Sequence, residues 1–176
     1  MNDIEFIDIL DVDDDLKDKV RRWRNSEQVS SFMLSRHVIT KEEHSRWIES
    51  LKSNAKQKLW MVFVDKTPIG SVYLKNTDHN QLISEWGFYI GESNYRGRGL
   101  GKRILYKFLE TFFETMGFKV LNTKVMFDNA VALHIYRAFR FIETDRTISD
   151  DSCEVVELKF SRADWLKYKE EIANGL

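Results

Sequence analysis

The sequence predicts a single α/β domain of the α+β kind, in which helices flank a mixed, mostly antiparallel sheet of about seven strands. Three observations support this fold class. Strand-like apolar runs and amphipathic helical segments follow one another in the order β-α-α-β-β-β-α-β-α-β-β-α. The chain has 176 residues, which suits one domain, so residues 1–176 are taken as one unit. The only proline, Pro68, leaves the longer elements uninterrupted.

The chain opens with a strand and two helices. Residues 4–10 alternate apolar and acidic side chains, which is the pattern of a half-buried strand. Apolar residues then recur at helical spacing within residues 14–24. Thr40 and Glu43 have the spacing of a capping box, so a second helix is expected to begin there.

Three strands are expected next. Residues 58–64 and 69–75 are apolar runs on either side of a short polar segment, which is the signature of a β-hairpin. Pro68 lies in that segment and leaves the turn type open. Residues 82–90 form a longer strand pattern, in which Gly87 indicates a bulge.

The C-terminal half begins with the strongest helical pattern of the chain. Apolar residues recur at helical spacing through residues 100–116, and Gly117 is placed to end this helix. Residues 120–127 read as a buried strand, after which Asp128 or Asn129 caps another helix.

Two closing strands and a last helix complete the prediction. The strands are expected at residues 141–144 and 153–160, separated by an acidic turn around Asp150 and Asp151. Ser161 then caps the final helix. That helix carries large apolar residues that either cap the sheet or contact a second copy of the chain, and we expect a homodimer: Trp165, Leu166 and Tyr168.

Composition and charge exclude several classes of protein. Hydrophobic residues make up 43% and charged residues 31%, which is an ordinary globular balance. The net charge of -1 provides no global field for nucleic acid, and no apolar run approaches the roughly 20 residues that span a bilayer. The acidic N-terminus lacks a signal-peptide pattern, and the single cysteine, Cys153, forms no internal disulfide. We expect a cytoplasmic protein with neither nucleic-acid nor membrane partners.

A glycine-rich loop lies between the strand at 82–90 and the helix at 100–116. Residues 96–102 read Arg-Gly-Arg-Gly-Leu-Gly-Lys. Glycines allow the backbone to approach a ligand closely, and the first turn of a helix presents unpaired N–H groups at the positive end of its dipole. Basic side chains add charge at the same place, so the loop predicts a phosphate or pyrophosphate site.

Two familiar phosphate-binding motifs do not fit this loop. A P-loop needs Gly-Lys followed by Ser or Thr, and no such run occurs in the chain. A dinucleotide fingerprint follows the first strand of a parallel unit, whereas this loop follows four expected strands. Nucleoside triphosphate and dinucleotide cofactors are therefore disfavoured.

Arg96-x-x-Gly99-x-Gly101 resembles the signature Arg/Gln-x-x-Gly-x-Gly/Ala of the GCN5-related N-acetyltransferases. The order of elements resembles their fold along nearly the whole chain. The resemblance implies acetyl-coenzyme A as co-substrate, no metal, and a sheet that splays between its fourth and fifth strands to admit the thioester. It implies pantetheine contacts at the end of the fourth strand and pyrophosphate contacts in the loop, from Tyr89, Ile90, Gly91, Arg96, Gly97, Arg98, Gly99, Leu100, Gly101 and Lys102.

A second match lies downstream. Asn129-x-x-Ala132-x-x-x-Tyr136 followed by Phe141 resembles the late helix of the same family, except that Arg140 stands where relatives have glycine. A non-glycine residue in a left-handed helix ending costs roughly 1 kcal/mol. By resemblance, Asn129 contacts the cofactor, and Tyr136 lies near the sulfur and donates a proton to the leaving thiolate.

The general base is left open by the sequence. Glu85 is the first candidate, because relatives often carry a glutamate at this place, although a solvated strand carboxylate is an equal alternative. His79 and His134 are further candidates, because histidine is the side chain best suited to exchange protons at physiological pH, but both are expected on exposed surfaces. Cys153 lacks a neighbouring histidine and is not expected to act as a nucleophile. No His/Cys cluster has metal-ligand spacing, so no metal is expected.

The region between the first two helices is expected to select the acceptor amine. Residues 20–52 resemble acetyltransferases of nucleotide-linked amino sugars, which acetylate the 4-amino group of a UDP-linked dideoxy sugar on the route to pseudaminic acid. On that hypothesis Trp23 and Met33 contact the deoxy sugar, Arg24 contacts a phosphate and His37 lies near the acceptor. Three alternatives remain: Trp23 and Met33 as ordinary core, a protein N-terminus or lysine as acceptor, and a non-catalytic coenzyme A sensor.

Overall fold

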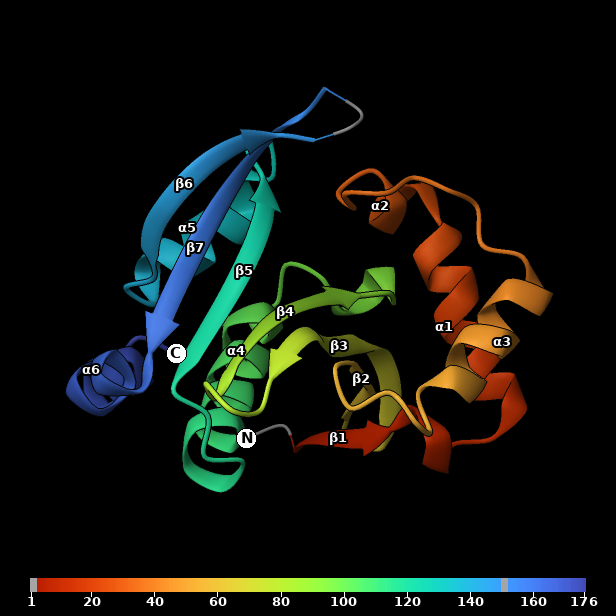
Figure 1. The fold of residues 1–176 in the computed structure, drawn as a ribbon, viewed down its shortest axis with the longest axis horizontal. Helices are drawn as coiled ribbons and strands as arrows, with labels where there is room; N and C mark the ends of the chain where they lie inside the picture. Colours follow the sequence, from red (N-terminus) through yellow and green to blue (C-terminus); the bar gives the residue numbers. More distant parts are fainter. Residues whose placement is uncertain (1–2, 150–151) are drawn as a thin grey trace.

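The computed structural model describes residues 3–149 and 152–176. Seven strands form one sheet in the order β1-β2-β3-β4-β5-β7-β6, and every neighbouring pair is antiparallel except β4 and β5 (Figure 1). The predicted mixed sheet flanked by helices is confirmed. The acidic turn predicted at Asp150 and Asp151 lies outside the described residues.

The elements have the following bounds: β1 (Ile4–Asp8), η1 (Ile9–Asp11), α1 (Asp14–Asn25), α2 (Glu27–Ser30), α3 (Lys41–Ser50), β2 (Lys58–Val64), β3 (Thr67–Asp78), β4 (Ile83–Ile90), η2 (Ser93–Tyr95), α4 (Leu100–Glu110), η3 (Thr111–Thr115), β5 (Val120–Met126), α5 (Ala130–Ala138), β6 (Ile142–Ile148), β7 (Glu154–Ser161) and α6 (Arg162–Asn174). Three short elements, η1, α2 and η2, were not predicted, and β6 is longer than expected. The predicted capping box is present, because Thr40 Oγ1 accepts from the Glu43 amide and Glu43 accepts from the Thr40 amide.

Two clusters of buried side chains hold the N-terminal half of the sheet between helices. On one face, Leu59 and Met61 of β2 pack with residues of α1 and α3. On the other face, Val62 and Val64 pack with α4 and with Trp86, whose ring stacks on Phe108 at 4.7 Å. This alternation follows from the two-residue side-chain period of a strand.

Gly87 and Pro68 have structural roles that differ from those expected from the sequence. The predicted bulge at Gly87 is wrong, because the β3–β4 register passes it without a shift, with Gly87 opposite Tyr73. Gly87 instead allows close approach: a Cβ there would lie 2.2 Å from the Tyr73 hydroxyl oxygen. The β2–β3 hairpin turns through Asp65 and Lys66, both at positive φ, which is a type I′ turn that leaves Pro68 inside β3.

The sheet splays between β4 and β5, as the family resemblance implies. The two strands pair over only three positions, 83–85 with 120–122, although both continue beyond them. Figure 1 shows β5 turning away from β4 along its length. Just past the last pair, the Thr123 hydroxyl donates to the Trp86 carbonyl at 3.2 Å, a group that the strand ladder no longer bonds. The unpaired strand ends therefore frame an opening.

The C-terminal helices are fixed mainly by buried side chains. Trp165 of α6 is buried, and its indole N–H donates to Glu114 at 2.7 Å, whereas Leu166 remains exposed. Phe141 donates its amide to the Tyr136 carbonyl at 3.0 Å, and Arg140 adopts φ 66°, which completes a Schellman ending for α5. The predicted left-handed arginine is confirmed.

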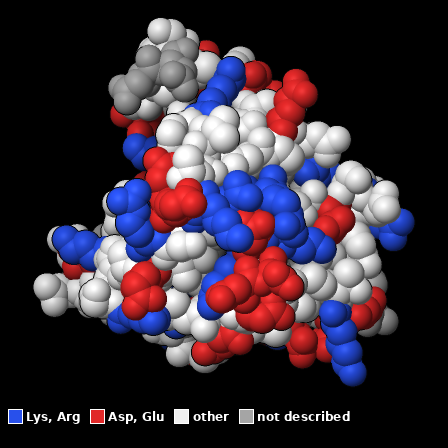
Figure 2. Space-filling view, turned by 90° about the vertical axis from the view of Figure 1, so that its right-hand side faces the viewer, with Lys and Arg blue, Asp and Glu red and all other residues white. Residues whose placement is uncertain are grey.

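The outer face of α1 and α3 is a solvated surface. Figure 2 shows basic and acidic side chains lying beside one another on this face. Along α1, Lys17 pairs with Asp14, while Arg21 and Arg22 both pair with Asp18. Exposed pairs of this kind contribute little to stability. Among the described residues, no helix has the length and apolar character needed to cross a bilayer.

Candidate active site

The opening between β4 and β5 leads into a cavity of about 560 Å³. Its walls come from β4, the glycine loop, β5, α5 and the segment around α2. We call it the donor cavity. Its lining includes the predicted catalytic residue Tyr136 and the following predicted cofactor residues: Tyr89, Ile90, Arg96, Gly97, Gly99, Leu100, Gly101, Lys102 and Asn129. Gly91 and Arg98 are the two predicted cofactor residues outside that lining.

The glycine loop is shaped for a ligand that approaches the backbone. Gly97 and Gly99 have φ of 71° and 73°, a region that favours glycine, and Gly99 is the N-cap of α4. Gly101 lies against α5, where an added Cβ would meet Ile135 at 3.2 Å. The loop therefore presents the first turn of α4, with Lys102, to the cavity. This arrangement fits a pyrophosphate group.

Each nitrogen of the Arg96 guanidinium donates a hydrogen bond to a protein oxygen. Its Nε donates to the Ile90 carbonyl at 2.8 Å, and its two terminal nitrogens donate to Gln28 at 2.8 Å and to the Gly91 carbonyl at 3.3 Å. The guanidinium thus ties the end of β4 to the loop and to α2. The Arg98 guanidinium lies 5.5 Å from the centre of the Tyr95 ring.

Gly91 and Trp23, which the sequence assigns to cofactor and acceptor, lie against each other. A Cβ on Gly91 would sit 2.2 Å from the Trp23 indole, and the Gly91 amide donates to the Ile69 carbonyl at 2.7 Å. Trp23 is buried with the α1–α3 core, and its indole N–H donates to Glu92 at 3.2 Å. Trp23 supports the strand end from behind and lines neither cavity.

Tyr136 and Asn129 lie on α5 and its N-terminus. The Tyr136 hydroxyl is 3.5 Å from Thr123 Oγ1, and burial raises the pKa of Tyr136 well above its usual range. The phenol is therefore protonated and can act as a donor. The Asn129 side-chain oxygen accepts from the Ala132 amide at 3.1 Å and so caps the helix that carries Tyr136.

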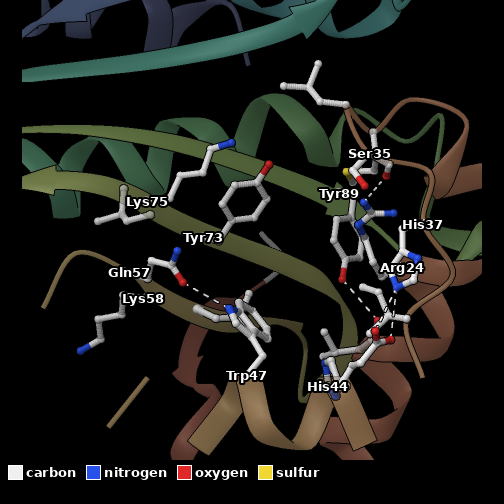
Figure 3. Close-up of a pocket in the computed structure, with 17 residues that line it drawn as sticks. Arg24, Ser35, His37, His44, Trp47, Gln57, Lys58, Tyr73, Lys75 and Tyr89 are labelled. Carbon is white, nitrogen blue, oxygen red and sulfur yellow. Dashed lines mark hydrogen bonds and ion pairs between the residues drawn. The ribbon is translucent and has the colours of Figure 1, made fainter. Parts of the chain in front are cut away.

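A second cavity of about 510 Å³ adjoins the first, and we call it the acceptor pocket (Figure 3). It lies among α1, α3, β2, β3 and the segment 33–39. Both cavities share three lining residues: Met33, Tyr73 and Tyr89. A ligand in the acceptor pocket therefore meets a ligand in the donor cavity at these three side chains.

Three of the predicted acceptor residues line this pocket. Met33 stands at the boundary between the two cavities. Arg24 donates to the Ser35 carbonyl at 2.5 Å, while its Nη1 is buried without a partner, and burial lowers the pKa of its guanidinium. His37 is exposed and lies 3.2 Å from the Glu43 carboxylate. Arg24 is thus the predicted residue with unused hydrogen-bonding capacity.

Glu85 is buried on β4 but lines neither cavity. Its carboxylate pairs with Lys75 at 2.9 Å and accepts from the Asn76 side chain at 3.2 Å. The other candidate bases are also placed by the structure. His79 lies in an exposed turn and bonds the Ala55 carbonyl at 2.8 Å, and His134 is exposed on α5. Among residues 3–149 and 152–176, no group of His, Cys, Asp or Glu is arranged to hold a metal ion.

Two residues of the acceptor pocket lacked a sequence signal of their own. Tyr73 reads as one more apolar position of β3, and only its place opposite Gly87 reveals its exposure to both cavities. His44 belongs to the 20–52 pattern, but its role depends on burial. Its Nε2 is buried without a partner, and burial lowers the pKa of the imidazole.

Comparison with known proteins identifies the family. Residues 10–142, more than half of the chain, match the acetyltransferase (GNAT) domain, so the chain belongs to the GNAT family. It is an acetyltransferase with acetyl-coenzyme A as the donor, which confirms the family resemblance seen in the loop and late helix.

Among curated relatives, acetyltransferase PseH of Campylobacter jejuni serotype O:23/36 (strain 81-176) is 27% identical over 143 residues, which cover 81% of this chain and 84% of the relative. PseH of Campylobacter jejuni serotype O:2 (strain NCTC 11168) is 30% identical over 120 residues, 68% and 73% of the two chains.

Solved structures support the fold. The Campylobacter jejuni N-acetyltransferase PseH in complex with acetyl coenzyme A superposes with a TM-score of 0.70 at 20% identity, covering 90% of this chain and 98% of that chain. Spermidine N-acetyltransferase of Vibrio cholerae, in complex with CoA and spermine, superposes with a TM-score of 0.82 at 13% identity, covering 94% and 98%. At these identities the similarity concerns the fold alone.

Proposed function

We propose that this acetyltransferase acts on a small anionic amine, namely the 4-amino group of a UDP-linked amino-dideoxy sugar. The observation that carries the proposal is Arg24. Its buried Nη1 lacks a partner in a pocket that adjoins the donor cavity. A buried polar group without a partner is costly, and a phosphate oxygen would satisfy it.

The charges around the acceptor pocket favour an anion over a cation. Lys58 pairs with Asp8, and Lys75 pairs with Glu85, so these lysines are already compensated. The pocket's acidic side chain, Glu43, contacts His37 and is held by the Thr40 amide, which is the main cause of its lowered pKa. Within the described chain, no carboxylate pairs with Arg24. A polyamine or a basic peptide would find no free carboxylate here, whereas a nucleotide phosphate would find a free cation.

The remaining walls suit the other parts of such an acceptor. They are mostly apolar, with side chains that include Val20, Ile39, Leu59 and Leu74. An amino-dideoxy sugar presents carbon-rich faces to such walls. The resemblance of residues 20–52 to nucleotide-sugar acetyltransferases, and the two relatives described as acetyltransferase PseH, support the same acceptor class.

Residues of the two cavities have different roles in the direct transfer of the acetyl group from the thioester to the amine. The acceptor nitrogen attacks the thioester carbonyl as a neutral amine, a C–N bond forms, and the C–S bond breaks. We assign Tyr136 to the sulfur, where its hydroxyl donates to the leaving thiolate. Since a thiol has an ordinary pKa near 8.5 and that of Tyr136 is raised, hydrogen bonding supplies most of this stabilisation. The product thiol gains the proton that the nitrogen loses.

We propose that Glu85 takes part in removing that proton through water. Direct transfer is disfavoured because Glu85 lines neither cavity and is held by Lys75. The acceptor pocket opens to solvent, so the proton has a second route through bulk water. A Glu85→Gln variant tests this role by steady-state kinetics, in which unchanged kcat would contradict it.

A turnover screen tests the acceptor. Acetyl-coenzyme A consumption is followed with UDP-linked 4-amino-dideoxy sugars, basic peptides and spermidine as separate acceptors. The proposal expects turnover with the nucleotide sugars. Turnover with peptides or spermidine alone would show that the acceptor class is wrong, and tight cofactor binding without any amine acetylation would favour a non-catalytic sensor.

A further inference from the structure

Three side chains form the boundary between the two cavities, and only one offers a free polar group. Met33 carries a thioether, which is a weak hydrogen-bond acceptor. The Tyr89 hydroxyl donates to the Val20 carbonyl at 3.4 Å, and burial raises the pKa of Tyr89 to about 12. The Tyr73 hydroxyl has no hydrogen-bond partner among the described residues. The Tyr73 phenol is therefore the group available to a ligand at this boundary.

Figure 3 shows how the two tyrosines differ in direction. The Tyr89 hydroxyl points down toward α1, where the dashed line marks its hydrogen bond, and the Tyr73 hydroxyl points the opposite way. Tyr73 of β3 and Tyr89 of β4 come from neighbouring strands and lie two residues apart in register, on the same face of the sheet. Tyr73 thus directs its polar end away from the helices of the acceptor pocket.

Gly87 shows where the Tyr73 hydroxyl lies. A Cβ on Gly87 would be 2.2 Å from the hydroxyl oxygen and 2.4 Å from Cζ, and Gly87 itself lines the donor cavity. The phenol oxygen therefore lies directly against the backbone of β4, at the place where that backbone borders the donor cavity. Any side chain at position 87 would displace it. Tyr136 lines the same cavity from α5.

We propose that the Tyr73 hydroxyl binds the acceptor's amino group and directs its lone pair toward the thioester carbonyl. A neutral primary amine has two N–H bonds, and one can donate to the phenol oxygen while the lone pair remains free. Burial raises the pKa of Tyr73, so the phenol stays uncharged. An uncharged oxygen does not favour the ammonium form as a carboxylate would, and the attacking form of the amine is retained.

On this proposal Tyr73 and Tyr136 contact different reacting atoms. Tyr73 acts on the incoming nitrogen from β3, and Tyr136 acts on the outgoing sulfur from α5. The inference concerns the transfer step itself and holds for any primary amine. The Tyr73 contact does not depend on the proposal that the acceptor is a nucleotide sugar. Its test must therefore give a result that is independent of the acceptor's identity.

A bisubstrate probe makes that separation. The sulfur of coenzyme A is joined through a CH2–C(O) bridge to the nitrogen of n-butylamine. The amide N–H of this probe takes the place of an N–H of the acceptor amine during attack on the acetyl carbon. Affinities of the probe and of coenzyme A are measured by calorimetry for the wild type and for Tyr73→Phe. We expect the variant to bind the probe about tenfold more weakly, the effect of one lost hydrogen bond, and to bind coenzyme A as the wild type does.

Tyr106→Phe is the matched control, because Tyr106 packs on Trp165 at 5.1 Å and lines neither cavity. It should leave both affinities unchanged. Unchanged probe affinity in Tyr73→Phe would overturn the inference, and so would an equal loss for coenzyme A, which would indicate a structural role. A wild type that binds the probe no better than coenzyme A would also overturn it. None of these results depends on which amine is acetylated in the turnover screen.

Discussion

The donor cavity and the acceptor pocket are built in opposite ways. The donor cavity relies on backbone conformation, with positive-φ glycines and the first turn of α4 supplied by seven consecutive residues, 96–102. The acceptor pocket relies on side chains from six separate segments, among them Arg24, His44 and Tyr73. A site formed by backbone conformation requires particular residues at consecutive positions, so it is recognisable as a sequence motif. A site formed by side chains from distant segments has almost no recognisable motif. The two cavities should therefore respond differently to substitution.

The largest expected effect is on the donor side. Gly99→Asp forces a non-glycine residue to φ 73° and places a carboxylate at the helix N-terminus that faces the cavity. Like charges at close range cost several kcal/mol, so acetyl-coenzyme A affinity should fall at least about 100-fold by calorimetry. Gly117→Asp is matched in backbone, with φ 76° and open space, but lies outside the cavity. Equal losses in both variants would show that backbone strain, rather than the loop, is responsible.

The second effect separates chemistry from binding within the donor cavity. Tyr136→Phe removes the hydroxyl that we assign to the thioester sulfur, and kcat should fall roughly 100-fold, which is typical when one hydrogen-bond donor to a developing negative charge is removed. Acetyl-coenzyme A affinity should stay within about twofold, because cofactor binding relies on the loop. Steady-state kinetics and calorimetry measure the two quantities. Normal turnover would remove Tyr136 from this role.

The third effect tests the side-chain nature of the acceptor pocket. Arg24→Gln should lower kcat/KM for a UDP-linked amino sugar about 10- to 30-fold, because hydrogen bonds to charged groups are strong. The same variant should leave acetyl-coenzyme A affinity unchanged. Arg22→Gln is the control, since Arg22 lies on the same helix but pairs with Asp18 outside the pocket. A fall of the same size for an uncharged amine would argue against a phosphate contact.

The smallest effect concerns stability and pH. Burial and, secondly, Arg21 lower the pKa of His44, while Asp18 acts in the opposite direction. The folded protein therefore keeps His44 neutral where the unfolded chain, with a pKa of about 6.5, takes up a proton. Its contribution to stability is present above pH 6.5 and is lost as the pH falls from there through the folded-state pKa. Thermal unfolding should show a lower Tm at pH 5.5 than at pH 7.5, and His44→Gln should reduce that difference.

Much of the fold was predictable because local patterns decided it. The capping box at Thr40 and Glu43, the long apolar face of α4 and the left-handed Arg140 all depend on a few neighbouring residues, and all are confirmed. The glycine loop belongs to the same group. The family assignment, which rests on these contiguous motifs, is confirmed by the match of residues 10–142.

The unpredictable parts depend on contacts between distant residues. The place of Gly87 beneath Tyr73 and of Gly91 against Trp23 is set by packing across strands and helices. The bulge predicted at Gly87 is therefore wrong. The sugar contact assigned to Trp23 stays a prediction, and Trp23 lines neither cavity. Arg96 likewise looks like a phosphate ligand in sequence, yet each of its three nitrogens donates to a protein oxygen, namely the Ile90 carbonyl, the Gly91 carbonyl and Gln28. Sequence shows the charge of a side chain, and only the fold shows which of its hydrogen-bond donors already have partners.

The short pairing between β4 and β5 has a consequence for the empty protein. Beyond 83–85 and 120–122, the facing borders of these strands are edges, and exposed edges exchange amide hydrogens and recruit foreign strands. Most proteins leave their edges at the rim of the sheet, where charge or short length blunts them. Here an edge lies in the middle of the sheet. If the co-substrate occupies the opening as we propose, it also covers that edge, and we expect acetyl-coenzyme A to slow amide hydrogen exchange in β4 and β5 and to reduce aggregation.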